Sequence, residues 1–148
     1  MLYHFKIHKD ADGYWADCVE LDGCFTQADS LEELYKNMEE ALNLYLDEPE
    51  SSIVFFPMPD KNLKGENIVK IPVNPKIGFA LAMRMLRRRR GLTQSQIAKL
   101  LGMKNLYSYQ RLENSRNANP SLTTLARIKR VFPELKIDEI LFAGSSEK

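Results

Sequence analysis

Cysteine and histidine are scarce in this sequence, which contains only two of each among its 148 residues. Cys18 and Cys24 do not form a CxxC pair, so in a reducing compartment we expect them to be free thiols. A zinc site that combines them with His4 and His8 is the alternative, because both histidines fall on one face of an expected strand. The cysteine spacing is not that of a usual ligand pair. We therefore expect no metal and no cofactor.

Long apolar runs are also missing from the sequence. No run approaches the ~18–20 residues that are needed to span a membrane. The first residues lack the basic region and apolar core of a signal peptide. We therefore expect a cytoplasmic protein that has no membrane partner.

The sequence lacks the usual catalytic patterns. It contains no Ser-His-Asp or Cys-His arrangement, no P-loop and no Gly-rich phosphate signature. A metal-dependent nuclease that uses carboxylates such as Asp12 and Asp17 is the alternative. These acids fall in or near turns, where Asp is common for backbone reasons alone. We therefore expect that the protein is not an enzyme.

Charge is distributed unevenly along the chain, although the formal net charge is only +1. Residues 1–75 hold 6 Lys+Arg and 15 Asp+Glu, a net charge of −9. Residues 76–148 hold 15 Lys+Arg and 5 Asp+Glu, a net charge of +10. Such asymmetry indicates two modules with different partners. The basic half suits a polyanion, and the acidic half suits a basic partner or forms a solvated surface.

Residues 1–73 have the pattern of a small α+β domain. Four strands are expected, at residues 2–9, 14–20, 24–28 and 67–73. A helix is expected over 31–47, with Ser30 as its N-cap and Glu33 completing a capping box. The order β-β-β-α-β predicts one helix on an antiparallel sheet. Residues 74–78, where the charge changes sign, are expected to be a linker.

Residues 79–142 have the pattern of an all-α module, followed by a tail at 143–148. Four or five short helices are expected, near residues 77–90, 93–101, 105–114, 121–131 and 136–142. Gly91 and Gly102 end two of them, and Thr93 caps the second. Compact modules of this kind pack short helices through tight turns.

The second and third of these helices, joined at Gly102, have the pattern of a helix-turn-helix unit. Their inner faces are expected to carry Ile97, Ala98 and Leu101, and Leu106, Tyr109 and Leu112. The outer face of the later helix carries side chains suited to base edges in the major groove. These expected base contacts are Asn105, Tyr107, Ser108 and Arg111. A plain helical bundle with a polar face is the alternative.

Residues 79–142 resemble the Xre/Cro-type helix-turn-helix family, through the patterns "LTQ…IA..LG" and "RLEN…..PSL.TL..I". The expected phosphate contacts are Gln94, Lys104, Asn114, Arg116 and Asn117. The resemblance also implies an ion pair between Arg87 and Glu113. One residue more than is usual stands between Gly102 and Glu113, and the turn or the start of the later helix must absorb it.

Arg87 is the first of four consecutive arginines, and the ion pair separates it from the other three. Helical spacing turns Arg88, Arg89 and Arg90 successively away from it. Their position at the end of a helix favours cations for dipole reasons alone. Attraction to DNA phosphates is the other interpretation, and both remain open.

The segment "GYWADCVELDGCFTQADSLEELYKNMEEALNLYLDE" resembles the N-terminal domain of HicB-type antitoxins. It departs from that pattern by lacking a proline before Gly23, by Ala28 in place of glycine and by Leu34 in place of alanine. The resemblance implies a fold like a reduced ribonuclease H fold without a competent active site. It also implies a partner, a HicA-like toxin, which is a small basic ribonuclease that cleaves mRNA.

The toxin contacts expected on this basis are Tyr14, Trp15, Asp17, Glu20 and Asp22. Ordinary sheet surface and core is the alternative for all five, and for Trp15 the core is favoured. Charge complementarity with the acidic half would speed the encounter with a basic toxin.

The combined expectation is an antitoxin of a type II toxin-antitoxin system. Its N-terminal domain would neutralise the HicA-like toxin. Its C-terminal domain would repress its own operon by binding double-stranded operator DNA as a homodimer or a higher even oligomer. The alternative is a stand-alone helix-turn-helix regulator whose acidic domain senses a ligand or oligomerises.

Overall fold

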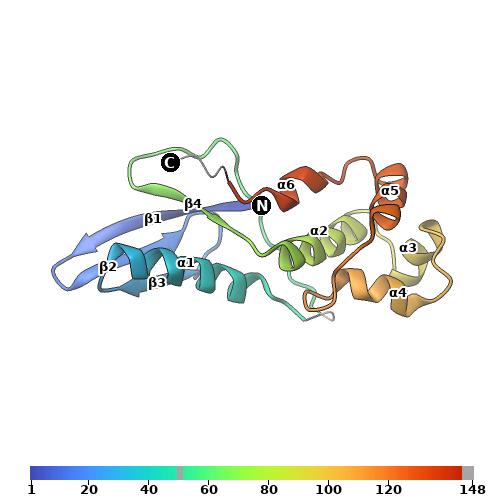
Figure 1. Cartoon of the computed structure of the whole chain (residues 1–148), viewed down its shortest axis with the longest axis horizontal. Helices are drawn as coiled ribbons and strands as arrows, with labels where there is room; N and C mark the ends of the chain where they lie inside the picture. Colours follow the sequence, from blue (N-terminus) through green and yellow to red (C-terminus); the bar gives the residue numbers. More distant parts are fainter. Residues whose placement is uncertain (50–51, 145–148) are drawn as a thin grey trace. The chain divides into compact units, whose positions relative to one another are not determined.

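The computed structural model of the chain describes residues 1–49 and 52–144, in two compact units (Figure 1). The N-terminal unit comprises residues 1–46, 55–74 and 142–144, and the C-terminal unit comprises residues 47–49, 52–54 and 75–141. The first unit contains the strands and one helix, and the second unit is helical. The α+β class is therefore confirmed.

The N-terminal unit is a four-stranded antiparallel sheet with one helix on it (Figure 1). Its strands are β1 (Leu2–Asp10), β2 (Gly13–Cys18), β3 (Phe25–Ala28) and β4 (Ile68–Pro72). Their order in the sheet is β3-β2-β1-β4, and every neighbouring pair is antiparallel. Helix α1 (Leu31–Leu46) lies between β3 and β4 in the chain. The predicted order β-β-β-α-β is confirmed.

Helix α1 packs through one stripe of apolar side chains. Leu34, Met38, Leu42 and Leu46 are buried, at the spacing that keeps side chains on one face of a helix. Tyr3 and Phe5 of β1 are fully buried on the sheet. The Ser30 hydroxyl accepts a hydrogen bond of 3.2 Å from the Glu33 N–H, so the predicted N-cap is confirmed. Burying each large side chain contributes about 1.5–3 kcal/mol.

Trp15 is not in the core, contrary to the expectation. Successive side chains of a strand point to opposite faces of the sheet, and in β2 Ala16 and Cys18 occupy the inward positions. Trp15 therefore points outward, is 39% exposed, and stacks on His8 with ring centroids 3.8 Å apart. A shift of one residue in the register of β2 would exchange its inward and outward side chains.

The two cysteines are joined by a backbone hydrogen bond, but the two histidines are hydrogen-bonded to carboxylates. Cys18 and Cys24 are free, and the Cys18 N–H donates to the Cys24 carbonyl over 2.8 Å. His4 Nδ1 is 2.8 Å from a Glu20 oxygen, and His8 is hydrogen-bonded to an aspartate. Within residues 1–49 and 52–144, no cluster of three His, Cys, Asp or Glu side chains could hold a metal ion.

The C-terminal unit contains five α-helices and one 3₁₀ turn. They are α2 (Pro75–Arg89), α3 (Gln94–Leu100), α4 (Leu106–Gln110), the 3₁₀ helix η1 (Arg111–Glu113), α5 (Leu122–Val131) and α6 (Ile137–Leu141). Residues 74–78, expected as a linker, are helical from Pro75 on, because proline suits the first position of a helix. The helix expected over 105–114 tightens into η1 after Gln110. None of the helices in the described part of the chain is long and apolar enough to cross a membrane.

At Gly13, in the β1–β2 turn, the backbone approaches a neighbouring strand too closely for a larger side chain. Its φ is +146°, and a Cβ there would lie 2.7 Å from the Ala28 carbonyl oxygen. Gly13→Ala should therefore destabilise the N-terminal unit by about 1–3 kcal/mol. Urea unfolding, followed by the fluorescence of Trp15, measures this, since the chain has a single tryptophan.

The control for this prediction is Gly23→Ala. Gly23 also has a positive φ, +83°, but its added Cβ would meet nothing within 4 Å. The second variant should lose less stability than the first. Equal losses would mean that the clash with Ala28 is relieved at no cost.

Candidate functional site

Helix α3 begins with a complete capping box. The Thr93 hydroxyl accepts from the Gln96 N–H over 3.1 Å, and the Thr93 N–H donates to the Gln96 side chain over 2.8 Å. Two backbone N–H groups that a helix start leaves without partners are thereby satisfied. The predicted cap at Thr93 is confirmed, and it fixes where α3 begins.

Gly102 ends α3 and forms the turn that leads to α4. Its φ is +69°, which is the left-handed conformation that favours glycine. The Gly102 N–H donates to the Lys99 carbonyl over 3.0 Å, and the Met103 N–H donates to the Ala98 carbonyl over 2.9 Å. This pair of bonds is a Schellman motif. The inner residues Ile97, Ala98 and Leu101 are buried, as expected.

Helix α4 begins at Leu106, because Asn105 is its N-cap. The Asn105 carbonyl oxygen Oδ1 accepts from the backbone N–H of Ser108 over 2.8 Å and from its hydroxyl over 2.9 Å. Two of the four expected base-contact side chains are thus bound to each other. Tyr107 and Arg111 are exposed, and so is Lys104.

The inner face of α4 differs from the prediction in one residue. Tyr109 and Leu112 are buried, as expected, but Leu106 is 39% exposed. Leu106 is the first residue of the helix, since the cap at Asn105 delays the helix start. The segment between Gly102 and Glu113 holds one residue more than is usual in the family. In the structure this segment consists of a three-residue connection, the short helix α4 and the 3₁₀ helix η1.

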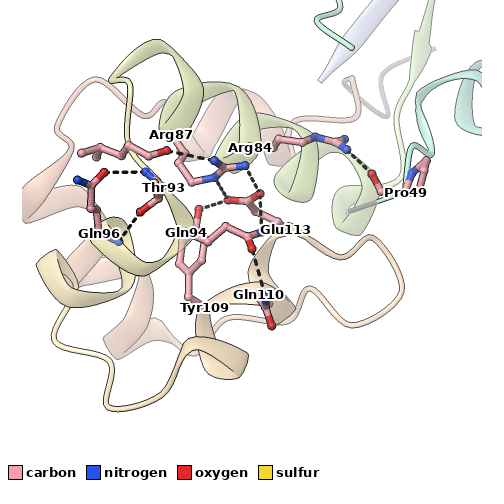
Figure 2. Close-up of polar contacts among 10 residues, drawn as sticks. Pro49, Arg84, Arg87, Thr93, Gln94, Gln96, Tyr109, Gln110 and Glu113 are labelled. Carbon is pink, nitrogen blue, oxygen red and sulfur yellow. Dashed lines mark hydrogen bonds and ion pairs between the residues drawn. The ribbon is translucent and has the colours of Figure 1, made fainter. Parts of the chain in front are cut away.

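Glu113 is the centre of a buried hydrogen-bond network (Figure 2). Arg87 Nε donates to one carboxylate oxygen over 2.7 Å, and its Nη2 donates to the other over 3.1 Å. The Tyr109 hydroxyl also donates to Glu113. Glu113 is only 1% exposed. The ion pair implied by the family resemblance is therefore present, in the bidentate geometry that strengthens such contacts.

Burial and the Glu113 carboxylate have opposite effects on the pKa of Arg87. Burial alone would lower the pKa of Arg87, but its hydrogen bonds and charge attraction to Glu113 outweigh burial and raise that pKa. Burial, and next the charge of Glu113, raise the pKa of Tyr109 above its ordinary value. The arginine therefore stays charged and the tyrosine stays a hydrogen-bond donor at neutral pH.

Gln94, expected at a DNA phosphate, is already engaged in this network (Figure 2). Its amide nitrogen donates to Glu113 over 3.3 Å, and its amide oxygen accepts from Gln110 over 3.2 Å. A side-chain amide has two N–H groups. A phosphate contact by Gln94 therefore has to use the second N–H or the backbone N–H.

The other three arginines of the run lie in three different surroundings. Arg90, expected to face water or phosphate, is paired with Glu134 through an Nε–O distance of 2.9 Å. A backbone hydrogen bond of Glu134, together with this arginine, lowers the pKa of Glu134. Arg88 is half-buried, and Arg89 is exposed at the end of α2.

The loop after η1 presents two of the expected phosphate contacts. Arg116 and Asn117 are exposed. Asn114 is half-buried, and its side-chain oxygen accepts from the Arg116 N–H over 2.9 Å. Because this bond shapes the loop, Asn114 holds Arg116 in position whether or not it also contacts a phosphate.

The residues expected to contact a toxin lie in different surroundings. Trp15 and Asp17 share the outward face of β2, and Asp17 is 2.8 Å from His8 Nε2. Tyr14 is half-buried, and Asp22 is exposed. Glu20 accepts hydrogen bonds from the N–H of His4, its ring and the N–H of Asp60. Glu20 therefore has a structural use within the unit.

Sequence reasoning missed the polar role of Tyr109 and the burial of Arg84. Tyr109 and Glu113 are four residues apart, a spacing that places side chains together on a helix and could have indicated the bond. Arg84 is 2% exposed, and its Nη1 donates to the Pro49 carbonyl over 2.9 Å. Burial lowers the pKa of Arg84, against the attraction of Glu113. No sequence signal indicated this contact.

Arg87 should contribute far more to stability than Arg89. Arg87→Ala leaves the Glu113 charge buried without its main partner, which costs about 3–5 kcal/mol. Arg89→Ala removes an exposed side chain and should change stability by less than about 0.5 kcal/mol. Thermal unfolding followed by circular dichroism at the helical band compares the two variants. Equal unfolding temperatures would contradict the structural role of Arg87.

Comparison with known protein families identifies the helical region. Residues 79–132 match a family described as a helix-turn-helix domain. This range runs from within α2 to the end of α5 and includes the α3–turn–α4 unit. The C-terminal unit therefore contains a helix-turn-helix domain, which indicates DNA binding.

Three relatives carry the name UPF0150 protein. The protein of Helicobacter pylori is 38% identical over 80 residues, which are 54% of this chain and the whole of that relative. The protein of Archaeoglobus fulgidus is 48% identical over 48 residues, 32% of this chain and 70% of that relative. The protein of Synechocystis is 41% identical over 46 residues, 30% of this chain and 58% of that relative. The chain covers the full length of the first relative at this identity, and it therefore belongs to the UPF0150 family.

Proposed function

We propose that the protein is an antitoxin of a type II toxin-antitoxin system. In this proposal the N-terminal unit binds and neutralises a HicA-like mRNA ribonuclease. The C-terminal unit binds operator DNA and represses the operon that encodes both proteins. The single observation that carries the proposal is a helix-turn-helix domain in a half of charge +10, joined to a half of charge −9.

DNA binding is supported by the chemistry of the C-terminal unit. A basic module gains affinity by releasing the counterions of DNA phosphates. The exposed side chains Lys104, Arg111, Arg116 and Asn117 lie on the turn that enters α4, on η1 and on the loop that follows η1. A helix-turn-helix domain uses these places to contact bases and backbone. Two-fold operators require a homodimer or a higher even oligomer, which we also propose.

Toxin binding is supported by the acidic surface of the N-terminal unit and by the resemblance of residues 13–48 to HicB. Glu32, Glu33, Glu39 and Glu40 of α1 are exposed, and so is Asp22. Opposite charges on two proteins speed their encounter and disfavour wrong partners. The proposed mechanism is that the acidic unit covers the RNA-binding face and catalytic residue of the toxin.

We also propose that the protein acts by binding and not by catalysis. The carboxylates of Asp17 and Glu20 are hydrogen-bonded within the unit, to His8 and His4. A phosphodiester-cleaving site would need them free to bind Mg²⁺. Magnesium-dependent cleavage of RNA by the purified protein, lost in Asp17→Asn, would contradict this part of the proposal.

Co-expression tests the toxin-binding half of the proposal. A HicA-like ribonuclease encoded beside this gene should arrest growth alone, and expression of the full chain should restore growth. The two proteins should also co-purify. If neither occurs while DNA binding persists, the protein is a stand-alone helix-turn-helix regulator.

Arg111 is expected to contact a base in the operator. Arg111→Ala should weaken operator binding by about 1–3 kcal/mol and relax the preference at one base position. Binding titrations against single-base operator variants measure both effects. An unchanged base preference would remove Arg111 from base readout.

Arg116 is expected to contact a phosphate. Arg116→Ala should weaken binding to all sequences alike and lower the salt dependence by about one counterion. Titrations at several salt concentrations measure the slope. Lys36→Ala is the control, since Lys36 is an exposed cation on α1 of the N-terminal unit. The same slope change in both variants would contradict a specific contact by Arg116.

A further inference from the structure

The outer face of α4 differs chemically from the one that its sequence predicts. Asn105 and Ser108 were expected to reach bases, but they hydrogen-bond each other across the first turn of the helix. Gln110 is half-buried and donates to Gln94. Most of the polar side chains of this segment are therefore used to hold the helix and its neighbour.

Leu106, Tyr107 and Arg111 are the large exposed side chains on the outer arc of this segment. Tyr107 is 65% exposed and Leu106 is 39% exposed. At about 100° per residue, Tyr107 lies opposite the buried Tyr109 and Leu112, and Leu106 and Arg111 lie on either side of it. The surface that α4 and the start of η1 offer thus includes a leucine, a tyrosine ring and a guanidinium group, beside the exposed Ser108 hydroxyl that is bound to Asn105.

The major groove of DNA offers matching groups. The C5-methyl group of thymine is the apolar group that a base edge presents there, and guanine presents two acceptors that suit an arginine. Helix α4 is the element that a helix-turn-helix domain inserts into this groove. The +10 charge of residues 76–148 favours a polyanion as the occupant of this face.

We infer that Leu106 and Tyr107 read thymine methyl groups, beside a guanine read by Arg111. This inference rests on the proposed DNA-binding function and assigns the operator chemistry that α4 recognises. It adds Leu106, which was expected on the inner face, to the residues that determine specificity. It also assigns Asn105 and Ser108 to the helix cap.

Replacement of thymine by deoxyuridine tests the inference, since it removes only the methyl group. The full-length protein first selects a bound duplex from a random-sequence pool. Each thymine of that duplex is then replaced in turn, and dissociation constants are measured by fluorescence anisotropy. At one or more positions, binding should weaken about fourfold, which corresponds to about 0.8 kcal/mol for one methyl-sized group.

Variants of the protein identify the side chains involved. In Leu106→Ala, thymine and deoxyuridine duplexes should bind equally at one of the sensitive positions. Tyr107→Phe should keep the methyl dependence, because the ring remains, and Tyr107→Ala should reduce it. Leu44→Ala is the matched control, since Leu44 is a 70% exposed leucine on α1 and should change nothing. Alanine is favourable in helices, and circular dichroism checks that each variant is folded.

Each outcome separates the inference from the function on which it rests. If a duplex binds specifically and every deoxyuridine replacement is neutral, methyl readout is wrong and DNA binding stands. If the methyl effect persists in both alanine variants, Leu106 and Tyr107 are not the readers. If no duplex is enriched over non-specific DNA, the proposed DNA-binding function fails together with the inference.

Discussion

One buried carboxylate holds the helix-turn-helix domain together. Glu113 accepts hydrogen bonds from Arg87 of α2, Gln94 of α3 and Tyr109 of α4, so a single acceptor joins four elements, including its own. A buried charge that loses its partners costs several kcal/mol. Arrangements that separate these helices are therefore penalised. The orientation of α4 relative to α3, on which any fit to a DNA groove depends, follows from this requirement.

The opposed charges of the two halves are only partly available to partners. In the acidic half Glu20 and Asp17 bind His4 and His8. In the basic half Arg87 and Arg90 are paired with glutamates. Exposed glutamates on α1 and exposed cations around α4 remain. Charge complementarity between each unit and a different partner thus depends on these side chains and not on the formal totals.

Local sequence signals predicted most of the fold. Thr93 was predicted as a cap because threonine suits the position before a helix, and Gly102 was predicted to end that helix because a left-handed turn favours glycine. These features depend on atoms a few residues apart. The candidate site was predicted less well. Gln94, Leu106 and Trp15 all lie in elements that the sequence predicted, yet their surroundings differ from the expectation. Gln94 and Trp15 contact side chains from other elements, and in a strand a one-residue change in register reverses which side is buried.

The sequence by itself determined the α+β architecture, the helix-turn-helix pattern and the division of charge, because periodicity, caps and composition are local properties. Tertiary structure decided which side chains remain available to a partner. Packing of α3 and α4 around Glu113 engaged Gln94 and Gln110. The cap of α4 engaged Asn105 and left Leu106 exposed. A polar side chain has a limited number of hydrogen bonds to make, and only the folded chain shows which of them are already made.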